Sequence, residues 1–261
     1  MHQIRLFFTA LQFLTRLPVP RWVGFEPAWL NQCAGYFVLV GFCVGAIGAL
    51  ALSLAALILP AMVAVILSLM VTVLLTCGFH EDGLADTFDA LGGAVSRERA
   101  LLIMKDSRIG SYGALALTLM LALKISVLVE LVKTNPATAC VALVFLQGAS
   151  RFGPLLIMAS LPYARDVAHA KAKPLAQQIG RTAFVIATGT MALGAAIVLV
   201  WQPTERLALS ASILTLLGIS AALRAWFKAR LGGFTGDTLG ATQQITETAA
   251  LLAWLACVPC R

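Results

Sequence analysis

The chain has 261 residues, of which 60% are hydrophobic and only 12% charged, and its mean hydropathy is +0.90. Since soluble domains carry about 25% charged residues, this composition excludes a soluble globular enzyme, a disordered chain and a fibrous repeat. It predicts a protein of the lipid bilayer. The net charge of +7 could suit nucleic acid, but excess Lys and Arg in cytoplasmic loops explains it better in a membrane chain. No nucleic-acid partner is expected.

The N-terminal residues 1–30 predict an interfacial segment rather than a signal peptide. They have a basic start and a short apolar stretch, but Arg16, Pro18 and Pro20 follow where small residues would mark a cleavage site. We therefore expect an amphipathic helix in the membrane interface, with Arg5 and Arg16 among the lipid headgroups.

The remaining chain predicts an all-α, polytopic bundle of about seven transmembrane helices, forming one domain over residues 1–261. No Asp, Glu, Lys or Arg occurs between Glu26 and Glu81, which leaves room for two spans of about 20 residues each, with a break near Pro60. Five further apolar segments follow at about 112–133, 137–160, 182–201, 207–223 and 243–260.

The positive charges predict the orientation of these spans. Most Lys and Arg residues fall in the N-terminal segment and in three long connections at 80–111, 161–181 and 224–242. The positive-inside rule places all four in the cytoplasm, which in a bacterium makes this a multi-pass inner-membrane protein. Tight turns at Pro60, Asn135-Pro136 and Pro203 leave no room for a ligand on the other side, so we expect the active site on the cytoplasmic face.

The segment GFHEDGLADTFDALGG, residues 78–93, predicts a helix with an acidic face. Asp82, Asp86 and Asp89 follow at i, i+4 and i+7, which places them on one side of a helix. Converging carboxylates with no nitrogen or sulfur ligand favour Mg²⁺, and Glu81 and His80 are candidates for an outer ligand, a base or a supporting group. The alternative is a solvated acidic helix end, which the apolar opposite face disfavours.

Two further segments supply candidate phosphate ligands. Lys105, Ser107 and Arg108 precede Gly110 and Gly113 at the start of the next span, where backbone N–H groups could also bind an anion. The alternative for these cations is a positive-inside anchor, which we prefer for Arg97 and Arg99, and Asp106 could be an ion-pair partner or another metal ligand. Arg151 could reach the interface or face inward as an anion clamp, and its small neighbours favour the inward position.

The last polar segment, GGFTGDTLGATQQITE, combines glycines with side chains that could hydrogen-bond a sugar, base or phosphate. Its candidate substrate ligands are Thr235, Asp237, Thr242 and Gln243. Lys124, inside an apolar stretch, is expected to be structural. Acids for a metal, cations for phosphates and this polar segment on one face together predict metal-assisted chemistry at a phosphate linkage, with a carboxylate to deprotonate an attacking hydroxyl.

The motifs GFHEDGLADTFDALGG, MKDSRIGSYG, ASRFGP and GGFTGDTLGA, in this order, closely resemble the cobalamin synthase (adenosylcobinamide-GDP ribazoletransferase) family. The resemblance runs from FLTRLPVP to the last span. It implies that α-ribazole, or its 5′-phosphate, is joined to adenosylcobinamide-GDP with Mg²⁺, giving adenosylcobalamin, or its 5′-phosphate, and GMP. It also suggests other B12-assembly enzymes or a second copy of the chain as neighbours.

The resemblance assigns roles to these residues. Metal binding falls to Glu81, Asp82, Asp86 and Asp89, and one of these carboxylates or His80 takes the proton. The groups that meet substrate are Lys105, Ser107, Arg108, Arg151, Thr235, Asp237, Thr242 and Gln243.

Two other functions are weighed against this one. The acidic segment partly matches the CDP-alcohol phosphotransferase signature through Asp82-Gly83-Leu84-Ala85, but Asp86 stands where that signature has Arg, and no D-x-x-x-D follows at the right distance. A cation-coupled transporter would fit Arg151 and Lys124 in the membrane, yet such proteins place their site near the midplane between repeats, and no repeat is visible here.

Overall fold

The computed structural model describes residues 1–164 and 178–258, and within these ranges it is helical apart from one isolated bridge between Tyr163 and Phe234. The all-α prediction is confirmed. The α-helices are α1 (His2–Leu14), α2 (Trp29–Cys33), α3 (Phe37–Ala56), α4 (Ala61–Thr76), α5 (Phe79–Leu91), α6 (Arg97–Ile103), α7 (Ser111–Thr134), α8 (Pro136–Ala149), α9 (Phe152–Ser160), α10 (Arg181–Trp201), α11 (Arg206–Leu231) and α12 (Gly236–Cys257). Short 3-10 turns lie at Arg21–Val23, Ala34–Tyr36 and Pro203–Glu205.

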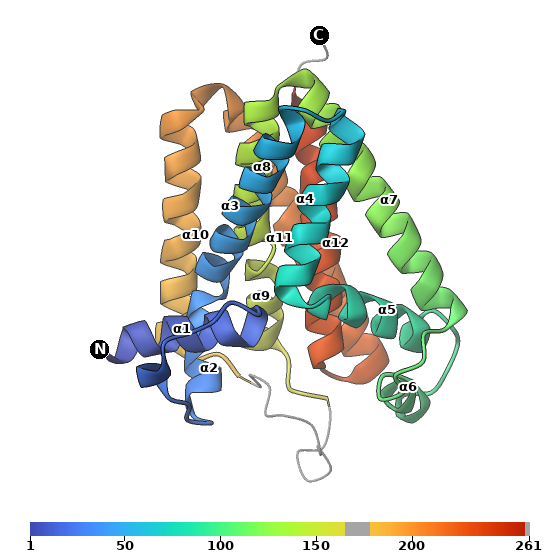
Figure 1. Cartoon of the computed structure of the whole chain (residues 1–261). Helices are drawn as coiled ribbons and strands as arrows, with labels where there is room; N and C mark the ends of the chain where they lie inside the picture. The colour runs from blue at the N-terminus through green and yellow to red at the C-terminus, as the bar shows by residue number, and fades with distance from the viewer. Residues whose placement is uncertain (165–177, 259–261) are drawn as a thin grey trace.

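The long helices run side by side, and α1, α5 and α6 lie at one end of the bundle (Figure 1). Helix α12 packs against α5, α7, α8, α9 and α11. Its Leu251 and Trp254 are completely buried. By contrast, Leu119, Val185 and Leu214, on α7, α10 and α11, are each more than 60% exposed. Large apolar side chains that face outward are expected where the surrounding solvent is lipid.

The chain is a multi-pass membrane protein. Five of the described helical segments are long and apolar enough to cross a bilayer, namely Trp29–Ala56, Ser111–Thr134, Pro136–Ser160, Arg181–Trp201 and Pro203–Leu231. A sixth candidate is the pair formed by α4 and α5, which is bent by 86°. The expected seventh span corresponds to α12, whose N-terminal half is too polar for the same criterion and is buried inside the bundle instead.

The connections between spans contain more helix than expected. The connection at 80–111 contains α5 and α6, and the one at 224–242 shrinks to residues 232–235 because α11 continues to Leu231 and α12 begins at Gly236. The extension of α11 has a physical reason: Leu223, Phe227 and Leu231 follow at i, i+4 and i+8 and are all buried, so one apolar stripe continues beyond the basic residues. Of the connection at 161–181, residues 165–177 lie outside the described ranges.

The bend between α4 and α5 shapes the site. Cys77 and Gly78 both adopt left-handed backbone conformations, with φ of 60° and 65°. Such a conformation costs a non-glycine residue about 1–2 kcal/mol. The chain after α1 braces this turn, because the Arg16 backbone N–H donates to the carbonyl of Leu75 at 2.8 Å and its guanidinium contacts the sulfur of Cys77. The expected amphipathic N-terminal helix is present as α1, with Leu6, Ala10 and Leu14 buried.

Candidate active site

The first and last polar motifs meet where α5 crosses α12. At this crossing, a Cβ atom on Gly83 would lie 2.8 Å from the backbone oxygen of Asp237, and one on Gly240 would lie 3.3 Å from the Cα of Gly83. Backbones this close leave no space for side chains, so glycine is required on both helices. The crossing fixes the acidic helix against the centre of the bundle.

A polar cleft of about 740 Å³ lies beside the N-terminal half of α5. Its lining includes Glu81, Asp82 and Asp86 from α5, together with Arg16 and Ser107. Asp82 is exposed and Glu81 is nearly buried. One oxygen of Glu81, Oε1, accepts a hydrogen bond from Gln244 at 3.0 Å, whereas the buried Oε2 has no partner among the described residues. The cleft therefore gathers three carboxylates and one guanidinium.

Asp89, the third aspartate of the predicted acidic face, lies outside the set of residues that line this cleft. Its carboxylate accepts hydrogen bonds from the backbone N–H groups of Gly110 at 2.7 Å and Gly113 at 2.8 Å, at the start of α7. A Cβ atom at either glycine would overlap the carboxylate. The amides predicted to bind phosphate thus bind Asp89, which favours the helix N-terminus as any anion would.

No group of three or more His, Cys, Asp or Glu side chains within 1–164 and 178–258 is arranged to hold a metal ion by itself. Of the three aspartates predicted on one helix face, Asp82 and Asp86 line the cleft, whereas Asp89 binds the start of α7. The cause is a contact between two helices: α7 begins next to the last turn of α5, and its first backbone N–H groups bind the Asp89 carboxylate.

The basic segment before α7 contributes Ser107 and Ile109 to the cleft, and Ser107 is the only predicted ligand of this segment that lines it. Lys105 and Arg108 are exposed and do not line it. Arg108 instead makes a two-pronged ion pair with Asp106, with a closest distance of 2.6 Å. This hydrogen bonding lowers the pKa of Asp106 to about 2, so Asp106 is the partner of Arg108. Arg97 donates to the carbonyls of Leu231 and Ala164.

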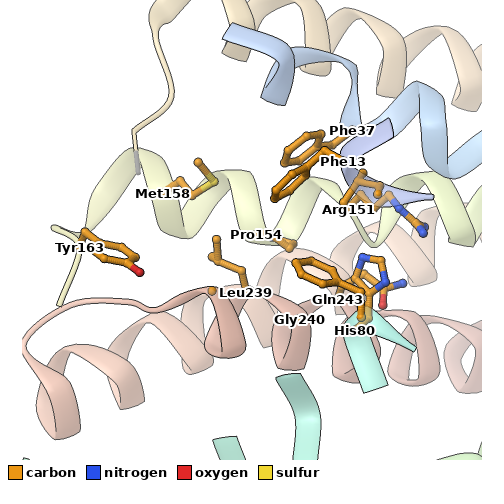
Figure 2. Close-up of a pocket in the computed structure, with 13 residues that line it drawn as sticks. Phe13, Phe37, His80, Arg151, Pro154, Met158, Tyr163, Leu239, Gly240 and Gln243 are labelled. Carbon is orange, nitrogen blue, oxygen red and sulfur yellow. The ribbon is translucent and has the colours of Figure 1, made fainter. Parts of the chain in front are cut away.

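Arg151 faces inward and is only 2% exposed, as its small neighbours predict. It lies at the break between α8 and α9, where its guanidinium donates to the backbone and side-chain oxygens of Gln147. Its Nε atom is buried with no partner among the described residues. Arg151 lines a second cavity together with His80 and Gln243 (Figure 2).

Of the four predicted ligands in the last motif, Gln243 is the one that lines a cavity. Thr235 caps α12: its hydroxyl accepts from the N–H of Thr238, whose hydroxyl accepts from the N–H of Thr235 in return. Thr242 donates to a backbone carbonyl of its own helix at 2.7 Å. Both threonines are completely buried. Asp237 is half-buried and accepts from the hydroxyl of Thr235.

A buried polar network runs from the cleft into the bundle. Lys124 on α7 lies 3.2 Å from Glu247 on α12, and both side chains are at most 3% exposed. Gln147 and Gln243 each donate to one oxygen of Glu247. Gln244 accepts from Lys124 and donates to Glu81, so the ion pair is linked to the floor of the cleft. A structural role for Lys124 agrees with this geometry.

The comparisons with known proteins agree with one another. A family model described as cobalamin-5-phosphate synthase matches residues 6–255. A protein of Leptothrix cholodnii named adenosylcobinamide-GDP ribazoletransferase is 52% identical over 256 residues, covering 98% of this chain and 96% of its own. One of the same name from Shewanella frigidimarina is 45% identical over 258 residues, covering 98% and 96%. The chain belongs to the cobalamin-5-phosphate synthase family. No solved structure matches it.

The site of this cobalamin-5-phosphate synthase family member includes contributors that the sequence did not single out. Arg16 was expected among lipid headgroups but lines the cleft, and Gln244 tethers Glu81. The polar run around Gln243-Gln244, at the start of the predicted last span, was the available signal for the buried network. No pattern pointed to Arg16, because its neighbours in space, Leu75 and Cys77, are about sixty positions away in the chain.

Proposed function

We propose that the chain is an adenosylcobinamide-GDP ribazoletransferase, which joins α-ribazole or its 5′-phosphate to adenosylcobinamide-GDP. The observation that carries the proposal is the cleft lined by Glu81, Asp82 and Asp86, with Arg16 on its wall. Carboxylates can take a proton and a guanidinium can pair with phosphate, and both are needed for exchange at a diphosphate. The names of the 52% and 45% identical relatives support the choice of substrates.

The reaction is a displacement at phosphorus. A hydroxyl oxygen of the ribazole sugar attacks the phosphorus linked to cobinamide and forms a new O–P bond. The bond from that phosphorus to the bridging oxygen breaks, and its electron pair leaves on the phosphate of GMP. The proton of the attacking hydroxyl passes to a carboxylate of the cleft or to His80, which lies beside Glu81 at the start of α5.

The donor set of the cleft fits Mg²⁺ in the mode that uses one or two carboxylates plus substrate phosphates. Asp82 is exposed to the cleft, Asp86 follows one turn later, and Glu81 has a buried oxygen without a partner among the described residues. We propose that one or two of these carboxylates, together with phosphates of the substrate, would hold the metal, and we leave out Asp89, whose oxygens bind the start of α7. When bound, the ion would neutralise charge on the diphosphate.

The positions of cationic side chains support a cytoplasmic cleft at the inner membrane. Helices α1, α5 and α6 lie at one end of the bundle (Figure 1). Arg16 and Arg21 follow α1 in the chain, and Arg97, Arg99 and Lys105 belong to α6 or follow it directly. The positive-inside rule assigns such an end to the cytoplasm, where a nucleotide-linked substrate would be available.

The test is GMP release by the purified protein in lipid nanodiscs, given adenosylcobinamide-GDP, α-ribazole and Mg²⁺. Asp82→Asn should lower the rate by about 10²-fold or more, while Glu130→Gln, at an exposed acid paired with Lys133, should keep it. Release must require both substrates. A folded wild-type protein that releases no GMP, or an Asp82→Asn variant with the wild-type rate, would contradict the proposal.

A further inference from the structure

His80, the neighbour of Glu81 in the chain, lines a second cavity (Figure 2). Its lining is almost wholly apolar: the rings of Phe13, Phe37 and Phe79 and the side chains of Pro154, Met158 and Leu239. Tyr163 also borders it, and Arg151, His80 and Gln243 gather at the opposite end in the close-up. The proposed chemistry at the diphosphate does not use this apolar chamber.

The apolar chamber is narrow. It encloses about 540 Å³ of empty space, counting the part open to solvent, but the centre of a water molecule could occupy only about 40 Å³ of it. The acidic cleft offers about 740 Å³ by the same measure. A narrow space with apolar walls suits a flat group and leaves little room for water.

The aromatic rings of the apolar chamber contact one another and form one aromatic wall. Phe13 and Phe37 are stacked, with an interplanar angle of 8° and centroids 5.7 Å apart, whereas Phe79 meets Phe13 edge to face at 72°. Offset stacking and edge-to-face contact are the two geometries that aromatic groups prefer. In nucleic-acid complexes, bases stack favourably on aromatic side chains.

At the polar end of the apolar chamber, Arg151 has an N–H group that could donate to a hydrogen-bond acceptor. Arg151 is 2% exposed, yet its Nε–H has no partner among the described residues. A buried donor without a partner is unfavourable, and an acceptor on a ligand would remove that penalty. The apolar chamber therefore suits a flat apolar body that carries a polar group at its inner end, which is the chemistry of an aromatic nucleoside.

The apolar chamber and the acidic cleft share a wall. Phe13 and Phe79 line both cavities, and the consecutive residues His80 and Glu81 face one each. A nucleoside whose base lies in the apolar chamber would have its sugar at this wall, with a hydroxyl next to the carboxylates. We infer that the apolar chamber binds the aromatic base of the ribazole substrate, while adenosylcobinamide-GDP takes the acidic cleft. This inference rests on the proposed function.

The test replaces one leucine by phenylalanine in each of the two cavities and compares the two variants. Leu239→Phe narrows the apolar chamber, and Leu117→Phe adds an equal volume to the acidic cleft, which Leu117 lines. Leu239→Phe should raise KM for α-ribazole about tenfold or more and leave KM for adenosylcobinamide-GDP within about twofold. Leu117→Phe should leave KM for α-ribazole unchanged. Equilibrium binding of α-ribazole alone, measured by calorimetry on the protein in nanodiscs, should weaken in Leu239→Phe by the same factor.

Leu239→Ala is the second variant, since it removes volume and cannot overpack the fold. It should also weaken α-ribazole binding by loss of contact with the base. An unchanged KM and affinity for α-ribazole in both Leu239 variants would overturn the inference, and so would an effect on adenosylcobinamide-GDP alone. Absence of GMP release in the wild type would instead refute the proposed function, so the two failures are distinguishable.

Discussion

Replacing Lys124 with methionine should destabilise the protein more than any surface change of charge. The Lys124 ammonium lies 3.2 Å from Glu247 Oε2 and donates to Gln244 at 2.8 Å, with both charged side chains at most 3% exposed. Methionine keeps the length of the side chain but removes the ion-pair partner of Glu247, which leaves this buried charge with only the more distant attraction of Arg151. Breaking a buried pair in this way costs about 3–5 kcal/mol.

The contacts that remain place the effect at the lower end of that range. Gln147 and Gln243 still donate to the two oxygens of Glu247 at 3.0 and 2.7 Å, and the lost hydrogen bond to Gln244 is worth only about 0.6 kcal/mol inside a membrane bundle. We therefore expect a loss of about 3 kcal/mol. The double variant Lys124→Met/Glu247→Gln should recover about half of it, because a neutral amide carries no charge and keeps one acceptor.

The matched control lies on the same helix. Lys133 pairs with Glu130 at 2.8 Å, but both side chains are more than half exposed, so Lys133→Met should cost less than about 1 kcal/mol. Free energies of unfolding are to be compared by titrating SDS into the protein in mixed micelles while following helix content. Equal losses for the two single variants, or no recovery in the double variant, would refute the reasoning.

Three further predictions concern α5 and its neighbours. Gly113→Ala should lower stability by about 1–3 kcal/mol, since its Cβ would lie 2.7 Å from the backbone oxygen of Ala85 and would overlap Asp89. The control Gly189→Ala should leave stability unchanged, because no described atom lies within 4 Å of the added Cβ. Thermal unfolding of the two variants distinguishes these outcomes. Asp89→Asn should lower stability by about 1 kcal/mol, whereas Asp82→Asn should stop GMP release and leave the free energy of unfolding unchanged. A loss of stability in both variants would contradict a structural role for Asp89 and a catalytic role for Asp82. Chelation with EDTA should stop GMP release and leave the unfolding midpoint in place, because α5 is held by α7 and α12; a falling midpoint would count against it.

The fold was largely predictable because its signals are local. The uncharged stretch from Glu26 to Glu81, with its break at Pro60, corresponds to α3 and α4. Asn135-Pro136 marks the turn between α7 and α8, where the Asn135 side chain accepts from the N–H of Ala137 at 2.9 Å and proline stands at the first helical position. Hydropathy and capping act over a few residues, so one sequence reveals them.

The acidic motif shows where local reasoning ends. Helical periodicity places Asp82, Asp86 and Asp89 on one face, and the structure does make this segment a helix. Periodicity cannot tell which of them meets another element. Gly110 and Gly113 take the Asp89 carboxylate from about twenty residues further along the chain, and their glycine character was equally compatible with binding phosphate. The same backbone amides serve either anion, and only the packing of α5 on α7 decides between them.

In helix α12, too, partners that are distant in the sequence determine what the polar residues do. Its polar residues, Thr242 and Gln243 among them, predicted a substrate-binding segment, because their side chains can hydrogen-bond a sugar, base or phosphate. In the bundle they are buried instead, since Lys124 and Gln147, each about one hundred positions away, supply partners for Glu247. An interior ion pair adds little stability compared with well-packed apolar residues. What distinguishes this one is its position: through Gln244 it is hydrogen-bonded to Glu81, so the polar core of the membrane bundle and the carboxylates of the cleft form one connected structure.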